Sequence, residues 1–144
     1  MDHADIVEIQ QLISFYGHAV DEPDQRLLPL VFTTDAVFIA PFGRYEGLEA
    51  ISAWFALGKP PHPPSHHVTN VCVHDVDGEV RVRSKWFVVD RNTGTASTGD
   101  YEDIVVKTAA GWRIKHRLCF FRFPSLEEVT KRRNAERQAA SMQS

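Results

Sequence analysis

The residues of this chain that could do chemistry are a few polar side chains set among apolar segments. Asp21 follows a helical pattern in YGHAVDEPD, and His66 opens an alternating segment directly after a proline-rich stretch. A histidine oriented by a carboxylate can remove and return a proton, which is the basis of general acid–base catalysis. Taken singly, each residue has a simpler interpretation, Asp21 as a helix cap and His66 as an exposed loop histidine.

Tyr16, His116 and Arg117 are further candidates, because each can donate a hydrogen bond to a substrate oxygen. Strand alternation puts His116 on the same face as Trp112 and Ile114, whereas Arg117 has the opposite parity. Both can point inward only if the strand contains a bulge. Of the two, the pattern favours His116 as the inward residue, and Tyr16 has an equally good interpretation as a core tyrosine.

The rest of the predicted pocket is apolar. Alternation places Asn70 on the same strand face as His66, so Asn70 is predicted to bind substrate. Phe38, Trp54 and Trp86 are predicted to line the pocket as well. Large rings around a few polar groups suit a small, hydrophobic, ring-containing ligand.

A metal site is a weak alternative for the histidine-rich segment. His62 and His66 have H-x-x-x-H spacing, but this spacing lies on prolines rather than on a helix, and adjacent His66 and His67 diverge on a strand. The chain also lacks the usual nucleotide-binding, serine-hydrolase and zinc-protease motifs. We therefore predict no metal and no organic cofactor.

The elements that must position these residues change character along the chain. Apolar residues at helical spacing predict a first helix ending near Gly17, a second helix over 24–31 and a third over 48–57, with a short strand over 36–41 between the last two. Alternating residues then predict an antiparallel meander of strands over 66–76, 80–89, 98–107 and 112–123. The S-x-x-E motif at 125–128 predicts a final helix.

This order predicts an α+β fold in which a strongly bent antiparallel sheet wraps around the N-terminal helices and leaves a cone-shaped pocket. The chain has 144 residues, of which 43% are hydrophobic, and this is enough for one domain over 1–144. A net charge of −3 argues against nucleic acid as a partner. With no apolar run long enough for a membrane span and no signal peptide, we predict a cytoplasmic protein without membrane contact.

Four segments together resemble the SnoaL-like branch of the nuclear-transport-factor-2-like superfamily. They are IQQLISFYGHAVDEPDQRLLPLVFTTDAVF, YEGLEAISAWF, HHVTNVCV and GDYEDIVVKTAAGWRIKHR, and they cover nearly the whole chain. The resemblance implies a cone-shaped α+β barrel. Members include scytalone and bile-acid dehydratases, a dehydrochlorinase, polyketide cyclases and non-catalytic binding proteins, so the fold alone does not determine the function.

In the dehydratase and dehydrochlorinase members, a carboxylate after the first helix orients a histidine at the start of a strand. Asp21 and His66 match these positions, so the resemblance implies that Asp21 accepts a hydrogen bond from one ring nitrogen of His66 while the other nitrogen faces substrate. Tyr16 matches a pocket tyrosine of the bile-acid dehydratase pattern, and Arg117 matches an active-site arginine of the dehydrochlorinase.

These residues predict a cofactor-independent lyase of the dehydratase type, or an isomerase, acting on a small hydrophobic ring-containing molecule. Two alternatives remain at this point. One is a polyketide-cyclase-like enzyme, and the other is a non-catalytic small-molecule-binding or subunit-assembly protein of the same fold.

The outer face of the predicted sheet also carries apolar residues that must be buried. If Trp112 faces the pocket, the same alternation turns Cys119, Phe121 and Phe123 outward, and Phe87 adds to them from a neighbouring strand. An apolar sheet face is normally buried. We therefore predict a homodimer or higher homo-oligomer through this face, with coverage by the final helix as the alternative.

Overall fold

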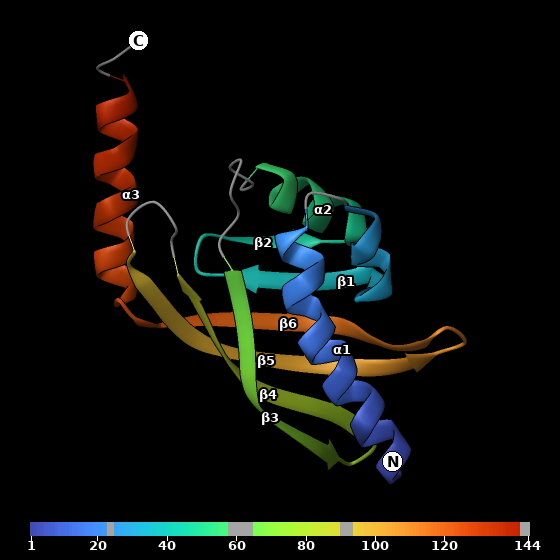
Figure 1. The fold of residues 1–144 in the computed structure, drawn as a ribbon. Coiled ribbons are helices and arrows are strands. Elements are labelled where there is room, and N and C mark those ends of the chain that lie inside the picture. The colour runs from blue at the N-terminus through green and yellow to red at the C-terminus, as the bar shows by residue number, and fades with distance from the viewer. Residues whose placement is uncertain (23–24, 58–64, 90–93, 142–144) are drawn as a thin grey trace.

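The computed structural model describes residues 1–22, 25–57, 65–89 and 94–141, and it shows one curved sheet with the N-terminal helices on its inner side (Figure 1). The elements follow the order α1 (His3–Asp21), the short 3-10 helix η1 (Gln25–Leu30), β1 (Phe32–Ala40), β2 (Gly43–Glu46), α2 (Leu48–Leu57), β3 (Ser65–Val76), β4 (Glu79–Val89), β5 (Ala96–Thr108), β6 (Gly111–Phe123) and α3 (Leu126–Ser141). The predicted α+β class is confirmed.

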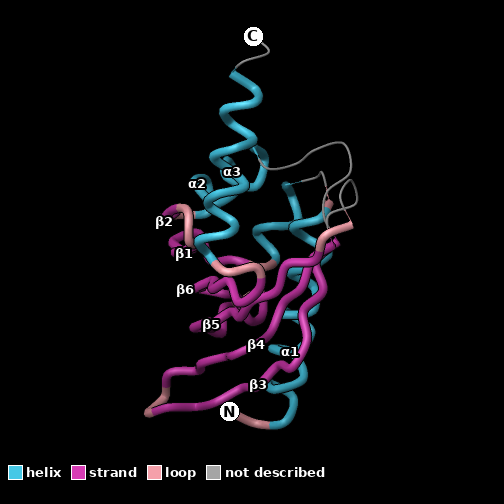
Figure 2. The backbone as a smooth tube through the Cα atoms, turned by 90° about the vertical axis from the view of Figure 1, so that its left-hand side faces the viewer, coloured by secondary structure: helices cyan, strands magenta, loops and turns pink. Residues whose placement is uncertain are grey.

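The sheet is mixed and open rather than a purely antiparallel meander. Its strand order is β2-β1-β6-β5-β4-β3, with antiparallel pairing except between β1 and β6, which run parallel. Figure 2 shows the strong twist that carries β3 and β4 away from β1 and β2. The meander was predicted correctly for β3 to β6, but β2 and the parallel pairing of β1 were not predicted.

Three element boundaries differ from the sequence-based expectation. The first helix continues past Gly17 and ends at Asp21, so Asp21 is the last residue of α1. The second helix is a short 3-10 helix that contains Pro29, a residue without the N–H that a longer α-helix would use, and predicted position 24 lies outside the described residues. The first strand begins at Phe32, four residues earlier than predicted.

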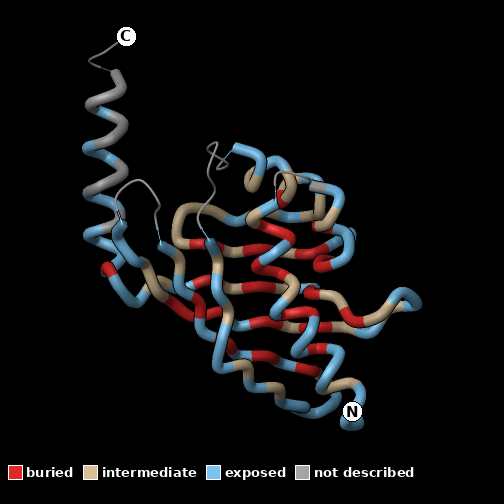
Figure 3. The backbone as a smooth tube through the Cα atoms, in the orientation of Figure 1, coloured by how far each residue is buried: buried red, intermediate tan, exposed pale blue. Residues whose placement is uncertain are grey.

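The core lies between α1 and the inner face of the sheet, where buried residues recur along β1, β4, β5 and β6 (Figure 3). Helix α1 contributes Ile9, Ile13 and Tyr16, which are at most 1% exposed. Their i, i+4 and i+3 spacing places them on one face of the helix. Val82 and Ile114 meet them from the sheet and are fully buried.

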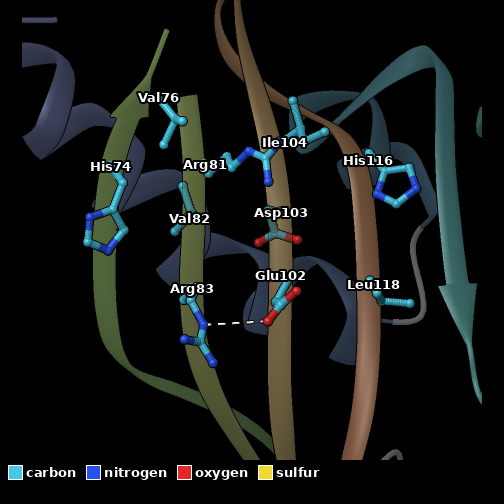
Figure 4. Close-up of a pocket in the computed structure, with 10 residues that line it drawn as sticks. All are labelled: His74, Val76, Arg81, Val82, Arg83, Glu102, Asp103, Ile104, His116 and Leu118. Carbon is cyan, nitrogen blue, oxygen red and sulfur yellow. Dashed lines mark ion pairs between the residues drawn. The ribbon is translucent and has the colours of Figure 1, made fainter. Parts of the chain in front are cut away.

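A bulge in β6 reverses the alternation halfway along the strand. Ile104 of β5 pairs with His116, and Val105 pairs with Ile114, so Lys115 is an extra residue on β6. Arg117 is therefore fully buried on the inner face, although its parity differs from that of Ile114. Figure 4 shows the opposite, outer face, where His116 lies with Ile104 on the side of the sheet away from α1.

A second bulge interrupts β3. The pairing skips from Thr69 with Lys85 to Cys72 with Arg83, and Asn70 lies in this interruption with a φ of 53°. Such positive φ values are uncommon for residues other than glycine, but asparagine tolerates them better than most. The bulge reverses the faces of β3, and Val71 and Val73 now pack against the core.

Helix α3 stands away from the sheet and continues upward beyond β6 in Figure 1. Its start is the predicted capping box, in which the Glu128 side chain accepts hydrogen bonds from the backbone N–H and the hydroxyl of Ser125. Over its described residues this helix does not cover the outer sheet face. Within the part of the chain that the structure describes, none of the helices is both long and apolar enough to span a bilayer.

The Asp5 side chain connects the start of α1 to β5 and β6 through hydrogen bonds. Its carboxylate accepts hydrogen bonds from Lys107 Nζ at 2.7 Å and from the Trp112 indole N–H at 3.1 Å. A third comes from the backbone N–H of Asp2, which caps the helix. The Lys107 and Asp2 hydrogen bonds lower the pKa of Asp5 from 3.8 to about 2.

The lowered pKa of Asp5 predicts how the stability contributed by its hydrogen bonds depends on pH. Because the folded pKa lies below the unfolded value, the Asp5 carboxylate stabilises the fold above about pH 4, and this contribution is lost as the pH falls toward about 2. Asp5→Asn should therefore unfold at a lower temperature than wild type near neutral pH, and the difference should shrink through this acid range. Thermal unfolding of both proteins across pH tests this, and a pH-independent difference would contradict it.

Candidate active site

The Asp21 carboxylate and His66 are in direct contact at the place where α1 ends and β3 begins. His66 Nδ1 lies 2.5 Å from Asp21 Oδ1, and the His66 backbone N–H donates to Asp21 Oδ2 at 2.6 Å. The side chains are 21% and 24% exposed for His66 and Asp21, respectively. The two contacts fix the orientation of the imidazole and leave Nε2 as the ring nitrogen that is not engaged by the carboxylate.

Gly17 allows this contact by letting α1 approach β3 closely. A Cβ atom at this position would lie 2.9 Å from the carbonyl oxygen of His66, closer than such atoms normally come. The glycine therefore sets the distance between the helix that carries Asp21 and the strand that carries His66. Sequence reasoning treated Gly17 as a helix terminator and missed this role.

Gly17→Ala tests the close approach. In a free helix, alanine would be more stable than glycine by about 1 kcal/mol, but here its methyl group would press on backbone. We expect a lower melting temperature than wild type, whereas His18→Ala, an exposed change on the next residue of α1, should leave the melting temperature nearly unchanged. A more stable Gly17→Ala protein would show that α1 can move off β3 without cost.

Tyr16 lies on α1, about one and a half turns before Asp21, and reaches into the core. It is 1% exposed, and its ring meets the His66 ring edge to face with centroids 6.5 Å apart. Burial raises the pKa of Tyr16 to about 12, against the opposing effect of the Arg117 cation. The phenol therefore stays protonated near neutral pH and can act as a hydrogen-bond donor.

Arg117 lies behind Tyr16 and forms a fully buried ion pair. Its Nε and Nη2 donate to the two oxygens of Asp103 at 2.7 and 2.6 Å, and both side chains have no exposed surface. The guanidinium carbon lies 3.9 Å from the ring centre of Tyr16 and 4.0 Å from that of Tyr101. Sequence reasoning did not identify Asp103 or Tyr101, although both share strand parity with the buried Val105.

Two predicted site residues lie elsewhere. His116 was favoured over Arg117 as the inward residue, and this was wrong because the bulge at Lys115 reverses the parity of β6. Asn70 was placed beside His66, but it is exposed at the bulge of β3 and borders a hollow that Cys72 and Lys85 also line. The extra residues of the two bulges are Asn70 and Lys115. A glycine or proline at these positions would have indicated a bulge in the sequence, but neither residue is of that kind.

The predicted aromatic residues form a continuous cluster on the inner side. Phe38 is 1% exposed and its ring centroid lies 5.1 Å from that of Trp54, which is only half-buried. Tyr45 stacks on Trp54 at 4.8 Å, and Phe55 meets Tyr16 at 6.4 Å. The cluster thus connects the partly exposed end of α2 with the tyrosine next to His66.

The histidines of β3 diverge as alternation requires. The His67 ring stacks on Phe87 with centroids 4.5 Å apart, on the opposite face of the strand from His66. Within the described ranges, no three His, Cys, Asp or Glu side chains come together as a metal site. His62, the other member of the H-x-x-x-H spacing, lies outside the described residues.

Comparison with known proteins places the chain in a family. A family model for the SnoaL-like domain matches residues 2–118. No match was found among curated proteins. Among solved structures, the chain is similar to a nuclear transport factor 2-like superfamily protein from Salmonella enterica, with 22% identity over 82% of this chain and 91% of that chain and a TM-score of 0.71.

Two proteins from Novosphingobium aromaticivorans are also similar. One is a candidate scytalone dehydratase, with 25% identity over 83% of this chain and 85% of that chain and a TM-score of 0.73. The other is a candidate aromatic ring hydroxylase, with 29% identity over 86% of this chain and 93% of that chain and a TM-score of 0.68. Because the family model spans most of the chain, the chain belongs to the SnoaL-like domain family, and these structures share its fold.

Proposed function

We propose that this protein is a cofactor-independent lyase of the dehydratase type, or an isomerase, that acts on a small hydrophobic ring-containing molecule. The observation that carries the proposal is the contact of His66 Nδ1 with Asp21 at 2.5 Å. With Nδ1 held by a carboxylate, Nε2 is the base, and the same carboxylate stabilises the imidazolium that forms when Nε2 accepts a proton.

The surroundings support the same chemistry. Tyr16 keeps its proton and lies against His66, so it can donate to a substrate oxygen as negative charge develops there. The aromatic cluster around Phe38 and Trp54 offers apolar contact area for a ring. Similarity to a candidate scytalone dehydratase and a candidate aromatic ring hydroxylase agrees with a ring-containing substrate.

A deuterium-exchange assay tests the proposal with model compounds in place of the natural substrate. The protein is incubated in deuterium oxide with a panel of small cyclic ketones and β-hydroxy ketones, and products are followed by mass spectrometry. We expect incorporation of deuterium next to the carbonyl group, and loss of water from those panel members that carry a hydroxyl β to it. No exchange and no elimination across the panel would favour the non-catalytic binding protein.

We also propose that two copies of the chain associate through the outer sheet face. Phe120, which the bulge turns outward, is 41% exposed. A hollow of about 410 Å³, lined by residues of β3 to β6 that include His116 and Leu118, lies on this face (Figure 4). The face carries a basic row on β4 beside an acidic row on β5, with Arg83 3.5 Å from Glu102. Because these rows already pair within one chain, a second copy related by a twofold axis can cover them without burying an unpaired charge.

Phe120→Glu should convert the dimer to monomers, because it would place two carboxylates at a buried interface. Leu57→Glu is the matched control, since Leu57 is 89% exposed on α2, away from the outer sheet face. Sedimentation velocity at micromolar concentration distinguishes the species. A monomeric wild type would contradict the proposed assembly, as would equal effects of the two substitutions. Phe121, the residue expected from the sequence, instead faces inward and packs on Trp86 at 5.1 Å.

A further inference from the structure

His116 is a half-buried histidine within the apolar part of the outer sheet face. In the strand pairing it lies between Val37 of β1 and Ile104 of β5, whose side chains are also half-buried. Leu118 and Phe120 follow it on the same face of β6, at every second position. Figure 4 shows its ring near Ile104 and Leu118, among the residues that line the hollow of about 410 Å³. His116 therefore lies within the surface through which we propose that two copies associate.

Every carboxylate near His116 on the strands around it already has a cationic partner. Most of these groups line the two hollows that His116 borders, and Glu46 of β2 lies opposite Val37. The pairs are Asp35 with Lys115 at 3.8 Å, Glu46 with Arg44 at 2.6 Å, Glu79 with Arg81 at 2.6 Å, Glu102 with Arg83 at 3.5 Å and Asp103 with Arg117 at 2.6 Å. These charges are balanced without His116.

Asp103 is the carboxylate that responds to a charge on His116, but it is not free to bind the ring. Burial raises the pKa of Asp103, and the positive charges of Arg117 and His116 oppose this effect. Both oxygens of Asp103 accept hydrogen bonds from Arg117 on the inner face of the sheet. Among the hydrogen bonds and ion pairs of the described residues, none involves the His116 ring.

Covering the outer face therefore affects neutral and protonated His116 differently. A histidine side chain gains a proton as the pH falls through about 6.5. On an open surface water solvates the imidazolium. Under a second copy, a neutral ring can keep hydrogen bonds to water in the hollow, whereas a charged ring loses bulk solvent and gains no free carboxylate. Burial of this unpaired charge is unfavourable, so the covered face favours the neutral ring.

We propose that His116 makes the homodimer sensitive to pH: with a neutral imidazole two copies associate through the outer sheet face, and protonation separates them. The inference rests on the proposed assembly and is independent of the reaction at His66. A twofold axis places two copies of His116 in each interface. Because the dimer binds fewer protons than two monomers, its dissociation constant rises as the pH falls.

Two other histidines share this face but lie on the edge strand β3. His74 is exposed opposite Arg81, and His67 is exposed and stacks on Phe87 with centroids 4.5 Å apart. At the edge of the sheet their charges stay in contact with water. We therefore expect His116, which lies two strands further in, to carry most of the pH response.

Sedimentation velocity over a concentration series tests this at about pH 7.5 and about pH 5.5, at constant ionic strength. If each of the two histidines is protonated only in the monomer, the dissociation constant of the wild-type dimer should rise by about 100-fold, or about tenfold for each histidine. The lower pH lies above the acid range in which Asp5 loses its contribution to stability. Circular dichroism at both values checks that the fold persists.

Substitutions of His116 give opposite expected results. His116→Gln is neutral at both pH values, so its dimer should dissociate equally at both. His116→Lys carries a permanent charge and should already be monomeric at about pH 7.5, at concentrations where wild type is dimeric. His18→Gln is the matched control, because His18 is exposed on α1, away from the outer sheet face, and this variant should keep the full pH response.

The other outcomes separate the pH response from the assembly itself. Equal dissociation constants for wild type at both pH values would overturn the role of His116 and leave the dimer standing. A wild type that is monomeric at both values would contradict the proposed assembly and, with it, this inference. A pH response that persists in His116→Gln, or that is lost in His74→Gln or His67→Gln instead, would overturn the assignment to His116.

Discussion

Replacing His66 with glutamine is expected to slow deuterium exchange into a bound cyclic ketone by about 10²–10⁴-fold, the usual contribution of a positioned general base. Glutamine has similar polarity but cannot accept a proton from carbon at neutral pH. The side chain is 21% exposed and its backbone N–H still reaches Asp21, so the fold should persist. Rates are compared by mass spectrometry, and circular dichroism checks the fold.

His67→Gln is the matched control for this substitution. It changes the same residue type one position along β3, but its ring stacks on Phe87 on the other face of the strand. Exchange by His67→Gln should match that of wild type. Similar losses in both variants would indicate a general effect on β3, and full activity in His66→Gln would mean that the base lies elsewhere.

Asp103→Asn should lower the free energy of unfolding by about 3–5 kcal/mol, because it leaves the Arg117 cation buried without a counter-charge. Both side chains have no exposed surface, so water cannot replace the lost carboxylate. A domain of this size has a total stability of about 5–15 kcal/mol, and the variant should therefore unfold at much lower urea concentration or not fold at all.

A double-mutant cycle distinguishes this pair from ordinary packing. The single changes Asp103→Leu and Arg117→Met should each be costly, whereas the double variant should recover part of the loss because no charge remains buried. Denaturant unfolding measures all four proteins. Additive losses would show that Asp103 and Arg117 do not depend on each other.

Much of the fold follows from patterns that are local in the sequence. Helix α2 begins at Leu48 and ends at Leu57 as predicted, because Gly47 and the apolar spacing act within a few residues. The long strands were also found, since each is a run of alternating and β-branched or aromatic residues bounded by turn residues. The position of Asp21 beside His66 came from family resemblance, because residues 45 positions apart carry no local signal of contact.

The errors come from features that depend on pairing between distant strands. The bulges at Asn70 and Lys115 arise from the register of β3 with β4 and of β6 with β5, which no single segment reveals. Each bulge reversed the predicted faces beyond it. Arg117 instead of His116 therefore entered the interior, and Leu118 and Phe120 instead of Cys119 and Phe121 turned outward. Asp103 could have been found, because it shares parity with the apolar Tyr101 and Val105 in GDYEDIVV.

The central claim, that Asp21 holds His66 as a base with Nε2 free for a ligand, is tested most directly by the tautomer of the His66 ring. Long-range proton–nitrogen NMR correlations identify which ring nitrogen carries the proton in the neutral imidazole. We predict a proton on Nδ1, directed at Asp21, and its partial redistribution in Asp21→Asn. A proton on Nε2 in the wild-type protein would contradict this claim, because the nitrogen facing a ligand would then be a donor and not a base.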